Sequence, residues 1–320
     1  MSLCGCTFIS DVIDQAHFIS KKDKIDLPGG SLLILQAALL GLNQVLIKLV
    51  NAGLQPVFQA GLRSAFAIIP ILAFALFMRR RLTVRDGSLP YGLACGLLFS
   101  VEFVFVFLAL DYTTVARVSV LFYTMPVWFT LAASVLLPGE HLTRSRVVGL
   151  ILSVCGITVA MFDRLASQTD GLLLGDLFAL AASVCWAAIA MLCRATPLKN
   201  SSSEMQLLYQ LSTSAMVLFP LSYLFGDQIR EMTTELAWIF AFQVVVVVAF
   251  GFSLWFWILS IYPASATASY SFLAPVFGVF FGWLILAEKI SFFIVIALVL
   301  VCIGIVLINR NEAKSSTSSD

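Results

Sequence analysis

Two oppositely charged side chains, Arg63 and Glu102, lie within long apolar stretches of the chain, and Glu102 is the only acid deep within one. Ionisable residues inside a membrane are costly and suggest a functional site. At about 1.5 Å per helical residue, Arg63 is expected about 9 Å, and Glu102 about 10 Å, below the same face. Pairing would offset the cost of burying either charge alone. We interpret the pair either as a static ion pair that fixes helix packing or as a site for proton coupling or substrate binding. Lys48 and Arg117 could compete with Arg63 for the Glu102 carboxylate.

Aromatic and amide side chains inside the apolar stretches form a second group of candidates. Most such rings pack against lipid or neighbouring helices, but some could line a cavity for an apolar or aromatic substrate, with hydroxyl and amide groups as polar handles. The candidates for substrate binding or coupling are Asn43, Arg63, Glu102, Tyr123, Trp186, Gln243, Trp255 and Tyr270. Pro126 and Pro275 are expected to kink their helices, because proline removes a backbone hydrogen bond. The kinks would shape the cavity and let the helices act as gates, or would serve packing alone.

The composition identifies the elements that carry these residues. Of 320 residues, 60% are hydrophobic and 12% charged, whereas soluble domains have about 25% charged residues. An apolar run of about 20 residues can cross a bilayer as a helix. The sequence predicts an all-α integral membrane protein with ten transmembrane helices, at 31–50, 57–77, 89–109, 115–136, 147–162, 175–194, 205–225, 236–258, 264–286 and 290–308.

The basic residues orient these helices. With ten spans, thirteen lysines and arginines lie on the side of the two termini and three on the opposite side. Because basic residues concentrate on the cytoplasmic side, both termini are expected in the cytoplasm of a protein in the cell inner (plasma) membrane. Residues 1–30 form a cytoplasmic extension that lacks the order of a cleavable signal. It is either an interfacial amphipathic helix or disordered, and the Ser-rich tail 309–320 is expected to be disordered.

Several functions are disfavoured by what the sequence lacks. The net charge of +1 comes without a basic stripe for nucleic acid. The seven cysteines are scattered, so neither a disulfide framework nor a metal site is expected, and no cofactor is implied. A membrane-embedded transferase would need a cluster of acids or histidines, and a channel would need charge rings or filter segments. The expected partners are the lipid bilayer and a small-molecule substrate, and the choice between monomer and homodimer is open.

The two halves of the chain resemble each other. Residues 110–142 match residues 259–290, so that Pro126 pairs with Pro275 and Glu140 with Glu288. This defines a first repeat at 31–162 and a second at 175–308. Five helices per repeat insert the second copy upside down, a common construction of secondary transporters with the substrate site between the halves. Both glutamates are expected to cap the next helix, where the helix dipole favours an anion.

The repeated pattern resembles the drug/metabolite transporter superfamily, and within it the EamA type. It is carried by Leu110, Thr113, Thr114, Ala116, Ser119, Pro126, Gly139, Glu140, Gly149 and Gly156, by Ala264, Ala266, Pro275, Ala287, Glu288 and Gly304 in the second copy, and by Asn43, Lys48 and Arg63. The resemblance covers about residues 31–308. It implies helices around a central cavity, alternating access, and substrates such as amino acids or related metabolites, usually exported.

The nearest alternative is an antiporter of sugar nucleotides or other phosphorylated metabolites. Such a carrier would need several cations deep in its cavity, and the second repeat offers only Arg194, near a helix end. A neutral, zwitterionic or weakly charged metabolite therefore fits better. The pattern does not encode the substrate, the direction of transport, the coupling ion or the oligomeric state.

Overall fold

The computed structural model describes residues 25–80, 82–84, 86–137, 142–167, 172–262, 267 and 270–309. The expectations for the segment before Ile25, for Glu140 and for the tail from Arg310 concern residues outside these ranges. The helices are α2 (Leu27–Asn51), α3 (Pro56–Phe77), α4 (Leu89–Tyr112), α5 (Val115–Phe122), α6 (Met125–Leu136), α7 (Arg144–Ser167), α8 (Leu172–Ala195), α9 (Ser203–Ser222), α10 (Thr234–Phe242), α11 (Gly251–Ile261), α13 (Leu273–Leu286) and α14 (Phe292–Asn309).

The predicted fold class is confirmed. Within the described residues, nine helical segments are long and apolar enough to cross a membrane, and α13 is a shorter apolar helix. Two of the nine are composite. One joins α5 to α6, and the other joins α10 to α11 through a π-helical segment, Gln243–Phe250. With α13, these segments account for the ten predicted crossings.

Local sequence explains where several helices begin. Asp26 accepts a hydrogen bond from the Gly29 amide at 3.0 Å, and proline stands in the first turn of α2. The Gln55 side chain accepts from the Phe58 amide at 2.6 Å before α3, and the Thr114 hydroxyl accepts from the Arg117 amide at 3.3 Å before α5. These caps satisfy backbone N–H groups that have no partner within the helix.

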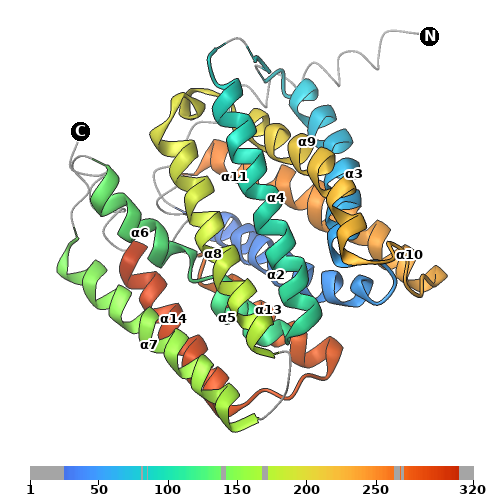
Figure 1. Cartoon of the computed structure of the whole chain (residues 1–320). Helices are drawn as coiled ribbons and strands as arrows, with labels where there is room; N and C mark the ends of the chain where they lie inside the picture. Colours follow the sequence, from blue (N-terminus) through green and yellow to red (C-terminus); the bar gives the residue numbers. More distant parts are fainter. Residues whose placement is uncertain are drawn as a thin grey trace, which may run out of the picture.

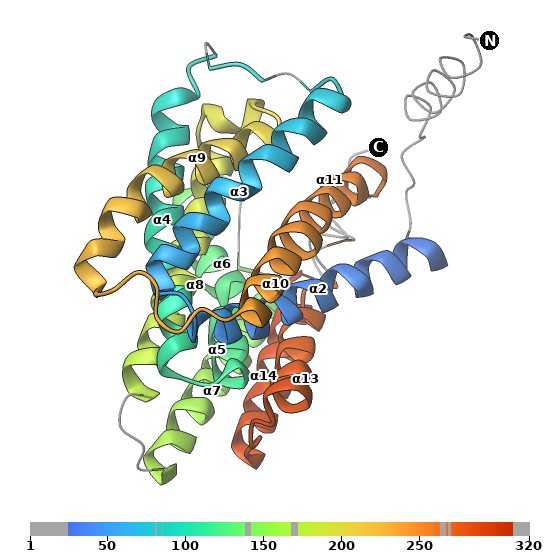
Figure 2. The same ribbon diagram turned by 90° about the vertical axis from the view of Figure 1, so that its right-hand side faces the viewer.

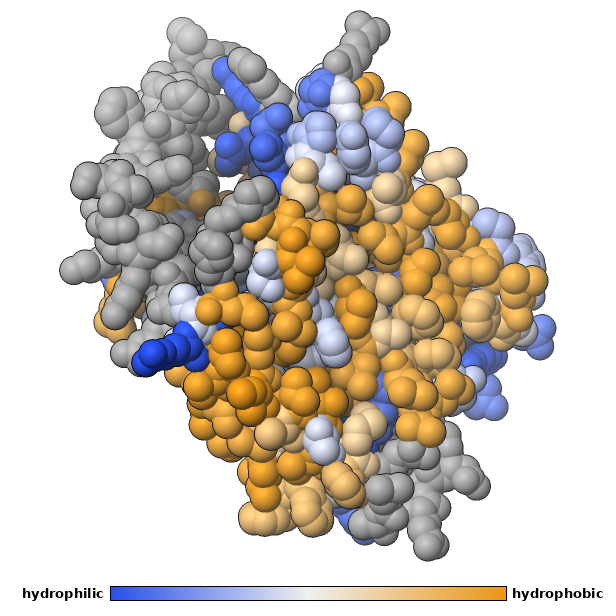
Figure 3. All heavy atoms as spheres, turned by 60° about the vertical axis from the view of Figure 1, so that its left-hand side comes forward, coloured by the Kyte–Doolittle hydropathy of each residue, from blue (hydrophilic) through white to orange (hydrophobic). Residues whose placement is uncertain are grey.

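The outer surface is apolar, as a lipid-facing surface must be. Val135 is 83% exposed and Phe292 75% exposed. On the face drawn in Figure 3, apolar side chains cover most of the area and polar ones gather toward its margins. In water this exposure would be unfavourable, whereas hydrocarbon makes it neutral.

The two repeats are interleaved. The most extensive packing joins a helix of one repeat to a helix of the other, in the pairs α7–α14, α4–α8, α3–α9 and α2–α13. Figure 1 shows α7 beside α14 and α4 beside α8, and Figure 2 shows α2 crossing the molecule above α13 and α14. We call the end where α2 begins and α14 ends the near face. The end where α2 ends and α14 begins is the far face.

The prediction that Pro126 and Pro275 kink continuous helices is wrong in its geometry. The chain leaves the helix at Tyr123 and Thr124, and Pro126 is the second residue of α6. Pro275 is likewise the third residue of α13, which begins at Leu273 rather than at 264 as expected. In a first turn the missing N–H costs nothing, since that group has no helical partner. Both prolines therefore start half-helices after a break.

Among the described residues, two prolines lie inside helices, namely Pro70 in α3 and Pro220 in α9, and these two helices pack against each other. They occupy matching helices of the two repeats. We did not single them out from the sequence.

Candidate functional site

A cavity of about 470 Å³ lies between the two repeats. Its lining comes from α2, α6, α8, α11, α13 and α14, together with residues that flank α5 and α13. The volume falls in the range of small-molecule sites, and the lining is mostly apolar with a few polar groups. The polar ones are Gln36, Thr130, Thr267, Ser271 and Asn309, besides the tyrosines and tryptophans.

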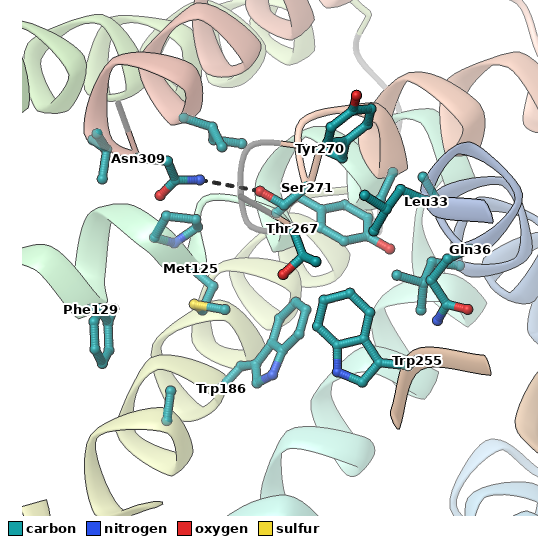
Figure 4. A pocket seen from close by; sticks show the side chains of 18 of the residues that line it. Leu33, Gln36, Met125, Phe129, Trp186, Trp255, Thr267, Tyr270, Ser271 and Asn309 are labelled. Atoms are coloured by element: carbon teal, nitrogen blue, oxygen red, sulfur yellow. Dashed lines mark hydrogen bonds between the residues drawn. The ribbon is translucent and has the colours of Figure 1, made fainter. Parts of the chain in front are cut away.

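Four of the eight predicted site residues line this cavity, namely Tyr123, Trp186, Trp255 and Tyr270. Trp186 and Trp255 appear on the same side of the pocket in the view of Figure 4, and the Thr267 hydroxyl is directed toward that side. Tyr270 and Ser271 lie on the opposite wall. Asn309 donates a hydrogen bond to the Ser271 hydroxyl at 3.4 Å, which joins the end of α14 to the start of α13.

The Trp186 ring is held by its neighbours. It stacks on Phe122 with ring centres 5.0 Å apart and planes 12° from parallel, and it meets the edge of Tyr123 at 6.1 Å. The helix break after Phe122 places both rings against α8. An aromatic wall fixed in this way offers a rigid face to an apolar or aromatic substrate group.

The lining residues lie toward the near face. Those on α2 run from Leu33 to Leu40, between its start and its middle, and those on α14 are in its last two turns. Trp186 and Ala190 are in the second half of α8, which begins at the far face. The cavity therefore belongs to the near-face side of the molecule.

The far face is closed by buried polar contacts. Arg117 of α5 and Asp176 of α8 form an ion pair with Nη2–Oδ2 at 2.6 Å, and their side chains are 5% and 0% exposed. Arg117 also donates to the Ala160 carbonyl of α7 at 2.8 Å, and Thr113 donates to Asp176 at 3.3 Å. A fork-shaped, charge-assisted pair of this kind is directional as well as strong. It ties three helices together.

Two further contacts reinforce this closure. The Glu288 carboxylate accepts from the backbone amides of Val115 and Ala116 at 2.8 and 3.0 Å. Lys48 donates to the Leu110 carbonyl at 2.9 Å and to the Thr113 carbonyl at 2.5 Å. Glu288 was expected to cap the next helix, α14, but it caps α5 of the other repeat. The cap has the predicted chemistry and a different partner.

Asn43, Arg63 and Gln243 meet in a polar cluster beyond the cavity. Asn43 Oδ1 accepts from Arg63 Nη1 at 3.3 Å and from Gln243 Nε2 at 3.2 Å. Gln59 Nε2 lies 3.5 Å from Gln243 Oε1 and extends the chain of amides. We call these four residues, together with Glu102, which precedes the Arg63-contacting Phe103 in α4, the polar cluster. Its members come from α2, α3, α4 and the π-helical segment.

The predicted pairing of Arg63 with Glu102 is not what the structure shows. The Arg63 guanidinium lies over the rings of Phe103 and Phe107, at 4.4 and 4.9 Å, and bonds Asn43. Glu102 Oε2 has no hydrogen-bond partner among the described residues. The prediction considered only the depths of Arg63 and Glu102 along their helices. The Arg63 guanidinium instead points toward the two phenylalanine rings and the Asn43 amide.

Asp176 is a buried, ion-paired acid that was not among the predicted site residues. It is fully buried near the start of α8, so Glu102 is not the only acid inside a span. Its position as the second residue of the predicted span 175–194 could have identified it as a buried acid. The expected competition of Arg117 and Lys48 for Glu102 does not occur, because both bind other partners. In the described part of the chain, no His, Cys, Asp or Glu side chains group as metal ligands do.

The interleaved repeats, the cavity between them and the closed far face define a multi-pass membrane transporter fold. Comparison with known proteins identifies its family. The model of the EamA-like transporter family matches residues 27–162 and 173–310, so the chain belongs to that family.

Curated relatives cover most of the chain. It is 25% identical over 267 residues to "Uncharacterized transporter YoaV" of Bacillus subtilis, an alignment that spans 83% of this chain and 91% of the relative. It is also 25% identical over 299 residues to a "Probable amino-acid metabolite efflux pump" of Escherichia coli, with 90% and 94% covered. A Salmonella typhimurium protein of the same description is 27% identical over 283 residues, with 85% and 90% covered.

A solved structure described as "Crystal structure of protein" has the same fold. It superposes with a TM-score of 0.63 at 20% sequence identity, and it covers 88% of this chain and 98% of its own.

Proposed function

We propose that the chain is a secondary transporter that exports small organic metabolites, such as amino acids or related compounds, across the cytoplasmic membrane by alternating access. The observation that carries the proposal is the asymmetry of the fold. An aromatic cavity of about 470 Å³ lies on the near-face side, while buried polar contacts close the far face. With the near face in the cytoplasm, as the basic residues favour, this is a state that loads substrate from inside the cell.

The lining supports the substrate class. Among the described lining residues none is cationic or anionic, whereas tryptophan, tyrosine, amide and hydroxyl groups are present. This favours a substrate with an apolar or aromatic part and small polar groups over a sugar nucleotide, whose phosphates would need several cations. The printed descriptions of two relatives, amino-acid metabolite efflux pumps, point the same way.

Counterflow in proteoliposomes tests the proposal. Vesicles with the purified chain are loaded with a mixed pool of amino acids and related metabolites, and isotope-labelled counterparts are added outside. Mass spectrometry then identifies compounds that exchange faster than in protein-free vesicles. Exchange of amino acids or related metabolites is the expected result. Exchange confined to sugar nucleotides, or no exchange, would overturn it.

A blocking variant links the exchange to the cavity. Ala190 lines the cavity, so Ala190→Trp should fill it and abolish exchange. Val135→Trp adds the same ring at a position that is 83% exposed on the lipid-facing surface. That matched control should exchange at the wild-type rate.

A further inference from the structure

The polar cluster contains a buried cation, Arg63, that forms no ion pair with any described side chain. Arg63 is 7% exposed and bonds an amide oxygen, Asn43 Oδ1, at the long distance of 3.3 Å. A guanidinium has five N–H donors in a planar fork that fits a carboxylate. The ring faces of Phe103 and Phe107 attract its charge but accept no conventional hydrogen bond. Its capacity for a bidentate anion is therefore unused among the described residues.

The same cluster contains acceptors that are buried and unpaired. Glu102 is 4% exposed, and its Oε2 has no hydrogen-bond partner among the described residues. Gln59 is fully buried, and its Oε1 is likewise unpaired. A buried polar atom left without a partner is costly, and such atoms are rare in native structures. Direct pairing of Arg63 with Glu102 would relieve part of this cost, yet the fold keeps them apart.

The position of the cluster suits a transported ligand. Three of its helices belong to the first repeat, while Gln243 belongs to the second, so the cluster bridges the two halves. Gln243 is the first residue of the π-helical segment, a deviation from α-geometry that is frequent at functional sites. Asn43 lies three residues beyond Leu40, a lining residue of the cavity, which places it about 4.5 Å further along α2.

We propose that the polar cluster anchors the zwitterionic end of an α-amino acid, with the carboxylate on Arg63 and the ammonium on Glu102. The inference rests on the proposed function and specifies its substrate class. The carboxylate would accept the fork of Arg63, supported by the amide of Gln243. The ammonium would donate to the Glu102 carboxylate, whose Oε2 has no hydrogen-bond partner among the described residues. One ligand thus satisfies both unpaired charges, and its side chain is left for the aromatic cavity.

Three substrate pools separate this recognition from mere size and polarity. Proteoliposomes with the full-length chain are assayed by counterflow with the twenty common amino acids, with their decarboxylated amines, and with their deaminated acids. The wild-type protein should exchange compounds of the first pool and exclude the other two. Arg63→Gln should lower amino-acid exchange by at least about tenfold, the usual effect of losing a charge-assisted hydrogen bond. Glu102→Gln should admit the deaminated acids.

Controls keep the test decisive. Arg80→Gln makes the same change at a near-face arginine that pairs with Glu204, and it should exchange at the wild-type rate. If Arg63→Gln does not fold, Arg63→Lys keeps the charge and loses the fork, and it should show a weaker form of the same defect. The selectivity of the wild-type protein among the three substrate pools tests the proposed anchor without any variant.

The outcomes are distinguishable. Wild-type protein that exchanges amines or deaminated acids as readily as amino acids would overturn the anchor and leave the proposed function in place. Full exchange by folded Arg63→Gln would do the same. Exchange of no pool and of no related metabolite would overturn the proposed function, and the anchor with it.

Discussion

The Arg117 guanidinium and the Asp176 carboxylate join the two repeats at the far face. Arg117 Nε lies 3.0 and 3.1 Å from the two carboxylate oxygens, and Nη2 lies 2.6 Å from Oδ2. The repeat gives this pair no counterpart at the near face. The offset that aligns Pro126 with Pro275 places Ala266, an uncharged residue, opposite Arg117. The charged closure seen at the far face therefore has no equivalent that the repeat would supply at the near face.

This burial makes the pair sensitive to the loss of one partner. Arg117→Met should destabilise the protein by about 3–5 kcal/mol, because it leaves the Asp176 carboxylate buried and unpaired. The double variant Arg117→Met/Asp176→Leu should recover most of this loss, since both charges are gone. Thermal unfolding of the purified protein in detergent measures both. Arg230→Gln, at the partly exposed pair with Asp111, should cost no more than about 1 kcal/mol. Losses that simply add in the double variant would contradict the direct coupling.

The same pair should control access from the far side. Ser119 is fully buried one half-turn beyond Arg117 in α5, and its hydroxyl donates to Gln44. In a background without the seven native cysteines, Ser119→Cys should react slowly with a membrane-impermeant maleimide applied at the far face. Adding Asp176→Asn should speed this reaction, because the closed arrangement loses its strongest contact. An unchanged labelling rate would show that the pair does not hold the far face shut.

The aromatic wall should contribute directly to substrate binding. Trp186→Ala and Trp255→Ala should each raise the half-saturating substrate concentration about three- to tenfold, which is the range expected from losing a ring contact. The measurement is the concentration dependence of counterflow with the best amino acid found in the pool assay. Trp238 is 73% exposed outside the cavity, so Trp238→Ala should leave that value unchanged. An equal effect of all three substitutions would show that Trp186 and Trp255 do not contact the substrate.

The sequence predicted the spans because each apolar run is long enough to cross a membrane, and length is readable along the chain. It also predicted Trp186 and Trp255 at the cavity. The pairing of Arg63 with Glu102 failed for a different reason. Depth follows from residue counting, whereas the direction of a side chain around its helix depends on neighbours such as Phe103 that only the packing reveals.

The helix breaks next to the two repeat-related prolines, Pro126 and Pro275, show a similar limit. Proline lacks the N–H group that would form a hydrogen bond inside a helix. Both a kinked helix and the start of a new helix are compatible with that loss. The composition of Tyr123–Thr124 gave no signal for the second outcome. Asp176 was overlooked because its partner, Arg117, comes from the other repeat, and a contact between repeats cannot be read from either alone.

The helix breaks should matter for transport more than for stability. Pro126→Ala and Pro275→Ala each restore an N–H in a first helical turn, which has no helical partner, so unfolding should change little. Transport should fall, because alanine permits α5 and α6 to merge into one helix and displace Tyr123 from the cavity wall. Counterflow and thermal unfolding on the same preparations test this. Full transport by the double variant Pro126→Ala/Pro275→Ala would reduce both prolines to packing residues.

The orientation of the molecule can be tested at two described loops. Arg80 follows α3 at the near face, and Gln228 lies between α9 and α10 at the far face, where its carbonyl accepts from the Gln55 amide. In the cysteine-free background, Gln228→Cys should react with an impermeant reagent added to intact cells, because the positive-inside rule places the far face outside. Arg80→Cys should react only after the membrane is opened. The reverse pattern would place the cavity of this structure on the outside of the cell, and would turn the proposed loading state for export into a release state.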